Sequence, residues 1–238
     1  MKKIFLLIIF NLSVIADYSD HKESEIVINE LVNQHGFDKS FVIQVLKNAQ
    51  RRDEMLESVA NPAEKTKTWD DYKAIFIKKK RIQDGQDFIK KNSEVLQKAE
   101  DTYHVPKEVI TAILGIETNY GKNMGNFRVL DSLTTLGFDD PRRSKFFRSE
   151  LIQFFLLTRE NNLDILKTKG SYAGAMGYSQ FISSSYRAYA IDFDDDGYVD
   201  LFNSVEDAIG SIANYLKIHG WKKDCLLYTS PSPRDLWI

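Results

Sequence analysis

Cysteine, proline and an excess of charge of either sign are scarce in this chain. Its 238 residues include five prolines and one cysteine, Cys225, so no disulfide can form within the chain. The 32 Lys and Arg residues are nearly balanced by 34 Asp and Glu residues, which gives a formal net charge of −2. Because nucleic-acid binding needs a basic surface, we expect no nucleic-acid partner. The composition is typical of a globular enzyme with one elaborated domain or two small ones.

The first 16 residues have the pattern of a targeting segment. Lys2 and Lys3 precede an apolar stretch that ends in a small residue, Ala16. This pattern predicts a secretory signal peptide over 1–16, and the stretch is too short to be a comfortable membrane span. The segment contains no cysteine to carry a lipid anchor. We therefore expect a periplasmic mature protein without a membrane span.

The rest of the chain has mainly helical periodicity. A helix is predicted to be capped by Ser24, and a long charged helix to run from Trp69 to about Glu100. Pro106 is expected at the start of another helix, where proline is tolerated. Further helices are predicted over 41–49, 142–157 and 205–217. Apart from a short strand pattern near residues 192–203, the chain reads as mainly α, with a helical segment over 17–105 followed by a second region over 106–224.

Glu117 lies in line with an apolar helical stripe, in the segment ILGIETNYG. A carboxylate there is costly, and partial burial raises the pKa of a carboxyl group towards neutrality. A protonated Glu at the edge of a cleft suits general-acid chemistry on a poor leaving group. The alternative is a Glu that only ends a core helix, with Gly121 as the helix cap. The stripe consists of Val109, Ile110, Ile113 and Leu114.

A second segment, GSYAGAMGYSQF over residues 170–181, combines small residues with aromatic and amide side chains. Small residues let a ligand approach the backbone, and aromatic and amide groups commonly line sugar-binding grooves. Taken alone, the composition of the segment favours a glycine-rich turn between two helices.

Residues 192–203, DFDDDGYVDLFN, match the start of an EF-hand calcium loop. Acids stand at loop positions 1, 3 and 5, Gly197 stands at position 6, and Tyr198 at position 7 offers its backbone carbonyl. The bidentate Glu expected at position 12 is replaced by Asn203. A solvated acidic turn is the alternative.

These segments, together with NELVNQHGF, SSYRAYAIDFDDDG and EDAIGSIANYLKIHGW, resemble the lytic murein transglycosylase B family from about Glu25 to Trp221. The resemblance implies a lysozyme-like catalytic domain that cleaves peptidoglycan between N-acetylmuramic acid and N-acetylglucosamine, leaving a 1,6-anhydromuramyl end. It implies that Glu117 acts as both acid and base. It also implies glycan contacts at Ser171, Met176, Gln180 and Tyr215.

The resemblance implies in addition a structural Ca²⁺ and no organic cofactor. Its ligands would be Asp192, Asp194, Asp196, the Tyr198 carbonyl and Asp207. Glu206 remains an alternative to Asp207 as the last ligand. Similarly, the apolar spacing around Tyr215 fits a core tyrosine as well as a glycan contact.

Most glycosidases use two carboxylates, but no second acid stands in an apolar setting comparable to that of Glu117. Asp131 follows a predicted turn, and Asp139 and Asp140 lie in a polar stretch. This absence favours a route in which the muramyl C6 hydroxyl is the nucleophile. The alternatives are a hydrolytic muramidase and a non-catalytic peptidoglycan-binding protein.

The last residues change composition abruptly. The segment CLLYTSPSPRD, which begins at Cys225, contains two of the five prolines and resembles the conceptual translation of a sequencing adapter. We interpret 225–238 as a non-native tail. In the family the chain continues past HGW with a YN-containing motif that helps close the groove, so the resemblance implies an incomplete catalytic domain.

Overall fold

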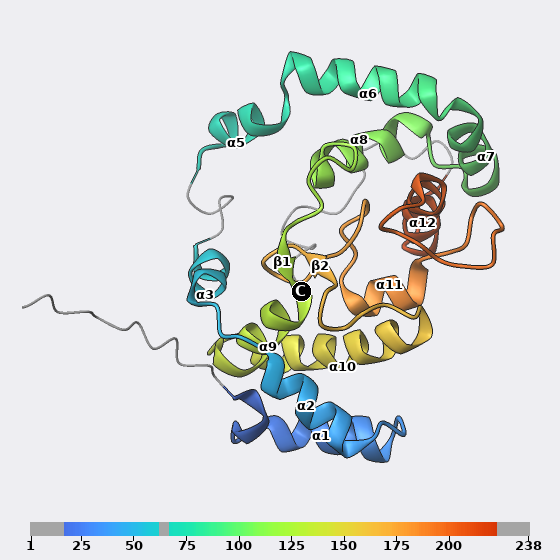
Figure 1. The fold of residues 1–238 in the computed structure, drawn as a ribbon. Helices are drawn as coiled ribbons and strands as arrows, with labels where there is room; N and C mark the ends of the chain where they lie inside the picture. Colours follow the sequence, from blue (N-terminus) through green and yellow to red (C-terminus); the bar gives the residue numbers. More distant parts are fainter. Residues whose placement is uncertain (1–16, 62–66, 223–238) are drawn as a thin grey trace, which may run out of the picture.

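The computed structural model describes residues 17–61 and 67–222, which form eleven α-helices and very little strand (Figure 1). The predicted signal peptide and tail lie outside the described residues. After a short 3₁₀ turn at Tyr18–Asp20, the helices are α1 (Ser24–Asn33), α2 (Lys39–Asn48), α3 (Asp53–Ala60), α5 (Trp69–Phe76), α6 (Lys79–Lys91), α7 (Ser93–Tyr103), α8 (Lys107–Thr118), α9 (Val129–Asp139), α10 (Ser144–Glu160), α11 (Ser183–Tyr189) and α12 (Val205–Ile218).

The core is built around α9 and α10, which lie side by side in Figure 1 with α1 and α2 below them and α11 above. Every residue of α9 from Val129 to Phe138 is buried. A helix buried on all sides must satisfy its polar side chains internally. Accordingly, the Thr134 hydroxyl donates to the Leu130 carbonyl at 2.7 Å.

Several predicted helix boundaries differ from those observed. Ser24 is the first helical residue rather than the cap, because its hydroxyl donates to the Ser19 carbonyl at 2.8 Å. The helix predicted from Trp69 to Glu100 is instead three helices, α5, α6 and α7. Its second break is at Asn92, whose side-chain amide donates to the Phe88 carbonyl at 2.9 Å. Asparagine often competes with helical hydrogen bonding in this way.

The described strands are two residues each and were not predicted. β1 (Phe127–Arg128) pairs antiparallel with β2 (Lys169–Gly170). Two residues are too few to show an alternating pattern. The short strand predicted near residues 192–203 does not form within the described chain. The pairing holds Ser171, which follows β2, next to the start of α9.

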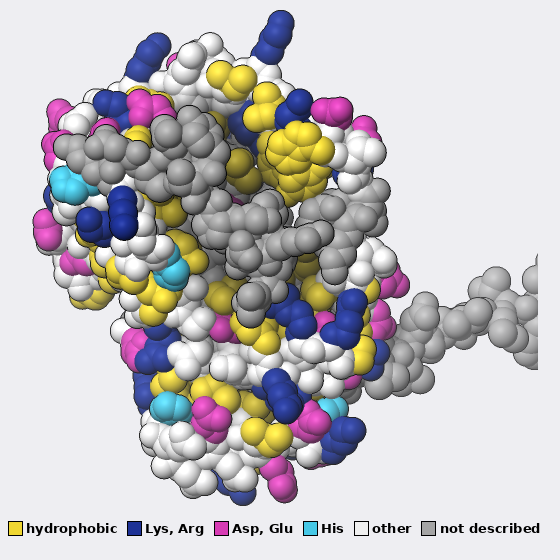
Figure 2. All heavy atoms as spheres, turned by 180° about the vertical axis from the view of Figure 1, so that it is seen from behind, with side chains coloured by type: hydrophobic (Ala, Val, Ile, Leu, Met, Phe, Trp, Pro, Cys, Tyr) yellow, Lys and Arg dark blue, Asp and Glu magenta, His cyan; other side chains and the backbone are white. Residues whose placement is uncertain are grey.

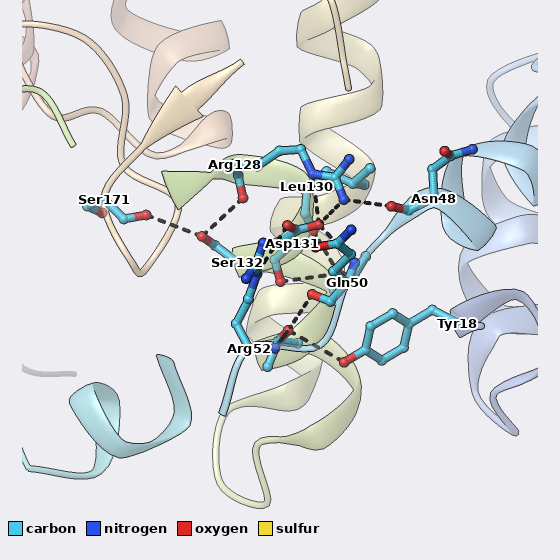
Figure 3. A network of polar contacts seen from close by, with 11 residues as sticks. Tyr18, Asn48, Gln50, Arg52, Arg128, Leu130, Asp131, Ser132 and Ser171 are labelled. Carbon is cyan, nitrogen blue, oxygen red and sulfur yellow. Dashed lines mark hydrogen bonds and ion pairs between the residues drawn. The ribbon is translucent and has the colours of Figure 1, made fainter. Parts of the chain in front are cut away.

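Asp131 joins the N-terminal helical segment to the core (Figure 3). It lies in the first turn of α9 rather than after a turn, and its side chain is 2% exposed. Its carboxylate accepts hydrogen bonds from Arg128 Nε at 2.9 Å and from the Gln50 amide at 2.9 Å. Arg52 lies 3.5 Å from its other oxygen. The buried charge is therefore neutralised by partners from both sides of the junction.

The same network extends towards both ends of α9. The Tyr18 hydroxyl donates to Asp139 at 2.6 Å, and the Arg52 amide donates to the Thr135 hydroxyl at 3.1 Å. At the other end, the Ser132 hydroxyl donates to the Ser171 carbonyl at 3.3 Å. Polar contacts thus connect the first described residues with the glycine-rich segment.

The surface near α5 is apolar. Trp69, Ile77 and Ile82 are 69%, 64% and 54% exposed, and Figure 2 shows hydrophobic side chains grouped at the side of the molecule where α5 lies. None of the helices described in residues 17–61 and 67–222 combines the length and apolar character needed to cross a bilayer.

We predict that Asp131→Ala lowers the free energy of unfolding by about 2–3 kcal/mol, because it removes a buried carboxylate and leaves the donors of Arg128 and Gln50 that point at it without their acceptor. The matched control is Asp53→Ala, which breaks an exposed ion pair with Arg51 and should cost less than about 1 kcal/mol. Urea denaturation of both variants tests this difference. Equal losses would mean that Asp131 does not hold the junction.

Candidate active site and metal loop

Glu117 stands one residue before the end of α8, directly ahead of an unusual backbone turn. Asn119, Tyr120 and Gly121 have φ values of 52°, 61° and 82°, three consecutive residues in the left-handed region. The Tyr120 amide donates to the Leu114 carbonyl at 3.0 Å and closes the helix. Such a conformation is costly for residues other than glycine and is commonly retained at functional sites. Gly121 is therefore the last of three turn residues, where a single cap was expected.

The end of α8 is clamped to the glycine-rich segment. Thr118 is buried, and its hydroxyl donates to the Tyr178 carbonyl at 3.0 Å and accepts from the Gly121 amide at 2.9 Å. A Cβ at position 121 would lie 1.8 Å from the Tyr178 ring. Only glycine lets the two segments approach this closely. The structure thus brings together the two motifs that carry Glu117 and the predicted glycan contacts.

The Glu117 carboxylate makes no hydrogen bond or ion pair with any described residue. Its side chain is solvent-accessible, yet burial raises the pKa of Glu117 above its ordinary value. The two observations are compatible because the exposed surface of Glu117 touches water, while the neighbouring protein lowers the amount of water around the carboxylate. The pKa also responds to the surrounding protein, which excludes more distant water.

Two of the predicted glycan contacts present free polar groups. The Ser171 hydroxyl oxygen accepts from the amide of Ala175 at 3.0 Å, and its proton has no acceptor among the described residues. The Gln180 side-chain amide donates to the carbonyls of Gly177 at 2.9 Å and Met124 at 3.2 Å. Within the described chain its oxygen remains without a donor. Both residues can therefore exchange hydrogen bonds with a ligand.

The other two predicted contacts are placed differently. Met176 is fully buried and is bonded to Phe181 through both backbone amides, at 2.9 and 3.1 Å. Its side chain has no accessible surface, and the glycan contact at Met176 stays a prediction. Tyr215 is half-buried, and its ring packs at 5.5 Å from Phe181 and stacks at 4.0 Å on His219. Tyr215 therefore combines a packing role with an accessible edge.

Three carboxylates converge in the predicted metal loop. Asp192, Asp194 and Asp196 each offer an oxygen within 4.8 Å of the other two. Gly197 turns the chain at φ 95°, and its amide donates to Asp192 at 2.8 Å. Tyr198 is exposed at the predicted position of a carbonyl ligand. Clustered acidic oxygens of this kind suit a hard cation such as Ca²⁺.

Asp207 occupies a different position from these three acids. Its carboxylate is buried and accepts from the Phe193 amide and the Asp200 amide, each at 2.7 Å. Burial raises the pKa of Asp207, and the two amide donors oppose the increase. Asp207 thus ties the loop together through hydrogen bonds, and it lies outside the group of three converging carboxylates.

Two residues of the loop's surroundings were missed in the sequence. Lys98 of α7 donates to the Phe193 carbonyl at 2.8 Å and lies over the Phe193 ring. Ser204 donates to Asp194 at 2.8 Å and caps α12 by accepting from the Asp207 amide. The Ser204 position before a helix is a recognisable capping signal. By contrast, no local pattern predicts a contact with Lys98, 95 residues away from Phe193.

Comparison with known proteins identifies the class of this fold and site. The family described as "Transglycosylase SLT domain" matches residues 20–229. The chain belongs to this family, and its predicted lysozyme-like, mainly α fold is confirmed.

The chain is similar to the membrane-bound lytic murein transglycosylase B of Escherichia coli (strain K12), with 42% identity over 216 residues. The match covers 87% of this chain and 60% of that protein, so the chain spans less than two thirds of the relative's length. The soluble lytic transglycosylase SltB1 of Pseudomonas aeruginosa superposes with a TM-score of 0.80 at 45% identity, covering 84% of this chain and 68% of that one. The Escherichia coli lytic transglycosylase Slt35 in complex with calcium gives 0.82 at 41% identity, covering 88% and 67%.

We predict that Glu117→Gln raises the melting temperature at pH 7. A carboxyl group whose pKa is raised in the folded state contributes stability at low pH, and that contribution is lost as the pH rises through the folded pKa. The difference between Gln and Glu should therefore vanish below about pH 4, near the ordinary pKa of glutamate, and grow towards neutral pH.

The control on the same helix is Glu108→Gln. Glu108 lies in the first turn of α8, where a negative charge is favourable, so its loss should cost about 0.3–1 kcal/mol at pH 7. Thermal melts between pH 4 and pH 8 compare the two variants. A lower melting temperature for Glu117→Gln at pH 7 would contradict the raised pKa.

Proposed function

We propose that this chain cleaves the glycan strands of peptidoglycan by lytic transglycosylation, with Glu117 as the general acid and then the general base. One observation carries the proposal: an unpaired carboxylate with a raised pKa stands at the end of α8, clamped to a loop with free polar groups. Membership of the SLT family supports the same chemistry.

The reaction needs one group that gives a proton and later takes one. Glu117 would donate its proton to the glycosidic oxygen as the bond to muramyl C1 breaks. The resulting carboxylate would then accept the proton of the muramyl C6 hydroxyl while that oxygen bonds to C1. The products are a free N-acetylglucosamine hydroxyl and a 1,6-anhydromuramyl end, and Glu117 is again protonated. A raised pKa increases the protonated fraction that the first step requires.

The acids considered as a second catalytic group are all engaged elsewhere. Asp131 is buried against Arg128, and Asp139 accepts from the Tyr18 hydroxyl. Asp140 is buried and accepts from the amides of Arg142 at 2.7 Å and Arg143 at 3.2 Å. These engagements support a route in which the substrate supplies the nucleophile.

The proposed glycan contacts are Ser171, Gln180 and Tyr215. The Ser171 hydroxyl can donate to a sugar oxygen, and the Gln180 oxygen can accept from a sugar hydroxyl. Tyr215 offers an aromatic edge near Phe181, which is bonded to the same loop. Met176 would act from beneath, by supporting Phe181.

We further propose that residues 192–207 bind Ca²⁺ in a structural role. The three converging carboxylates repel one another without a cation, and Ser204 transmits their position to α12, which carries Tyr215. A solved relative in complex with calcium supports this choice of ion. Asp192, Asp194, Asp196 and the Tyr198 carbonyl would hold it, with Asp207 or Glu206 completing the set. We also propose that the protein is secreted to the periplasm. In addition, we propose that residues 17–105 form a helical segment that precedes a catalytic region over residues 106–224, and that residues 225–238 are a non-native tail.

We predict that Glu117→Gln lowers the rate of muropeptide release from purified sacculi by at least about 10²–10⁴-fold while glycan binding is kept, because the amide cannot act as an acid. Glu108→Gln serves as the control and should retain the parent rate. Activity above about a tenth of the parent would assign the proton to another residue.

The products separate the proposed reaction from its rivals. Mass spectrometry should find anhydromuramyl ends in the digest of the parent chain. Reducing muramic ends would indicate a hydrolytic muramidase, and binding without any release would indicate a peptidoglycan-binding protein.

We predict that calcium raises the melting temperature, by the equivalent of about 2.7 kcal/mol at a hundredfold excess over Kd. Asp192→Ala and Asp196→Ala should abolish the increment, whereas the exposed Asp101→Ala should keep it. Because Asp207 also holds two backbone amides, its role is read from the calcium increment and not from the absolute stability. We expect a larger loss of the increment from Asp207→Asn than from Glu206→Gln. Equal melting temperatures in calcium and in chelator would show that the loop binds no calcium and is a solvated acidic turn.

A further inference from the structure

The side chain of Tyr120 fills a narrow space between two glycines from different helices. A Cβ on Gly85 of α6 would lie 2.6 Å from the Tyr120 Oη, and a Cβ on Gly115 of α8 would lie 2.6 Å from the same atom. Distances this short are not tolerated between nonbonded atoms, so both positions require glycine for the tyrosine to remain in place. In Figure 1, α6 runs along α8, and the glycines of the two helices both lie against the same tyrosine oxygen.

Tyr120 is held mainly by α6. Its hydroxyl donates to the Arg81 carbonyl at 2.9 Å, and its ring packs 5.5 Å from the ring of Phe88. Its own backbone is left-handed, with φ 61°. A tyrosine remains in this uncommon conformation only where its surroundings determine it. Here they are the carbonyl of Arg81 and the gap between Gly85 and Gly115.

Glu117 lies between the two points at which this part of the chain is fixed. On one side, the Tyr120 ring presses against Gly115, and a Cβ there would lie 2.7 Å from Cζ and 2.9 Å from Cε1. On the other, Thr118 is bonded to the Tyr178 carbonyl. The Tyr120 ring therefore contacts the same turn of α8 that leads to the carboxylate.

We infer that Tyr120 is a positioning residue: wedged between Gly85 and Gly115, it transmits the placement of α6 to Glu117 and keeps that carboxylate where the reaction needs it. The catalytic part of this inference rests on the proposed function. The geometric link between Tyr120 and Glu117 can be measured whether or not Glu117 is catalytic.

The two glycines allow an internal control. Gly85→Ala places a methyl group against the Tyr120 Oη, and Tyr120→Phe removes that oxygen and leaves the nearest ring carbon at 3.3 Å. Gly115→Ala instead meets ring carbons at 2.7 and 2.9 Å, which Tyr120→Phe retains. The phenylalanine should therefore rescue Gly85→Ala and should not rescue Gly115→Ala.

Two measurements report on Glu117 itself. The first is an NMR pH titration of its side-chain carboxyl carbon, assigned by the loss of the signal in Glu117→Gln. The second is the kcat and KM of muropeptide release. We expect Gly85→Ala to lower the pKa of Glu117 towards its ordinary value, because displacement admits water. Small misplacements are costly in catalysis, so kcat should fall about ten- to hundredfold with KM within about twofold. Gly85→Ala combined with Tyr120→Phe should return both quantities to those of Tyr120→Phe alone.

The outcomes separate this inference from its alternatives. If Gly85→Ala changes only the melting temperature, Tyr120 is a packing residue and the inference is overturned. The same conclusion holds if Tyr120→Phe rescues both glycine variants or neither. If Glu117→Gln retains activity, the proposed function fails, while the NMR titrations still decide whether Tyr120 positions the Glu117 carboxylate.

Discussion

The constraint on which the site depends is the cost of keeping one carboxylate partly dehydrated and without a cation. Such a group favours its neutral form, which suits an acid but opposes folding at neutral pH. Only one carboxylate bears this cost, because the other acids considered for catalysis have partners. Asp131 is surrounded by donors, Asp139 accepts from a tyrosine and Asp140 accepts from two backbone amides. Glu117 alone of these four has no partner in the described chain.

Holding an unpaired group in place requires support from elsewhere, and the support here is mostly backbone. Three left-handed residues follow Thr118, and its hydroxyl fastens α8 to the Tyr178 carbonyl. Glycines at 85, 115 and 121 make room for aromatic rings that approach within distances no other residue would allow. These close contacts and left-handed residues raise the local conformational energy, and they hold the carboxylate in place. Such strain is common at functional sites.

The predicted metal loop is connected to the helix that carries Tyr215. Asp207 accepts from the loop amide of Phe193 and Ser204 donates to Asp194, which connects the loop to α12 without an ion, and Lys98 fastens it to α7. A cation bound by the three converging carboxylates would therefore reinforce a loop that is already shaped. Its effect would pass through α12 to Tyr215 and Phe181.

The sequence by itself determined the family, the mainly α class and the separate motifs, because helical periodicity and residue types at fixed spacing are local properties. It also located Glu117 and the three clustered aspartates. Only the tertiary structure decided that Met176 is buried, that Asp207 binds backbone amides and that Asp131 is paired with Arg128 and Arg52 and accepts from the Gln50 amide. These contacts include Asp207 with Phe193, 14 residues away, and Asp131 with Gln50, 81 residues away, and no local pattern encodes which side chain reaches which partner. The pairing of Tyr120 with Gly85 is of the same kind, since the space it fills exists only once α6 has packed on α8.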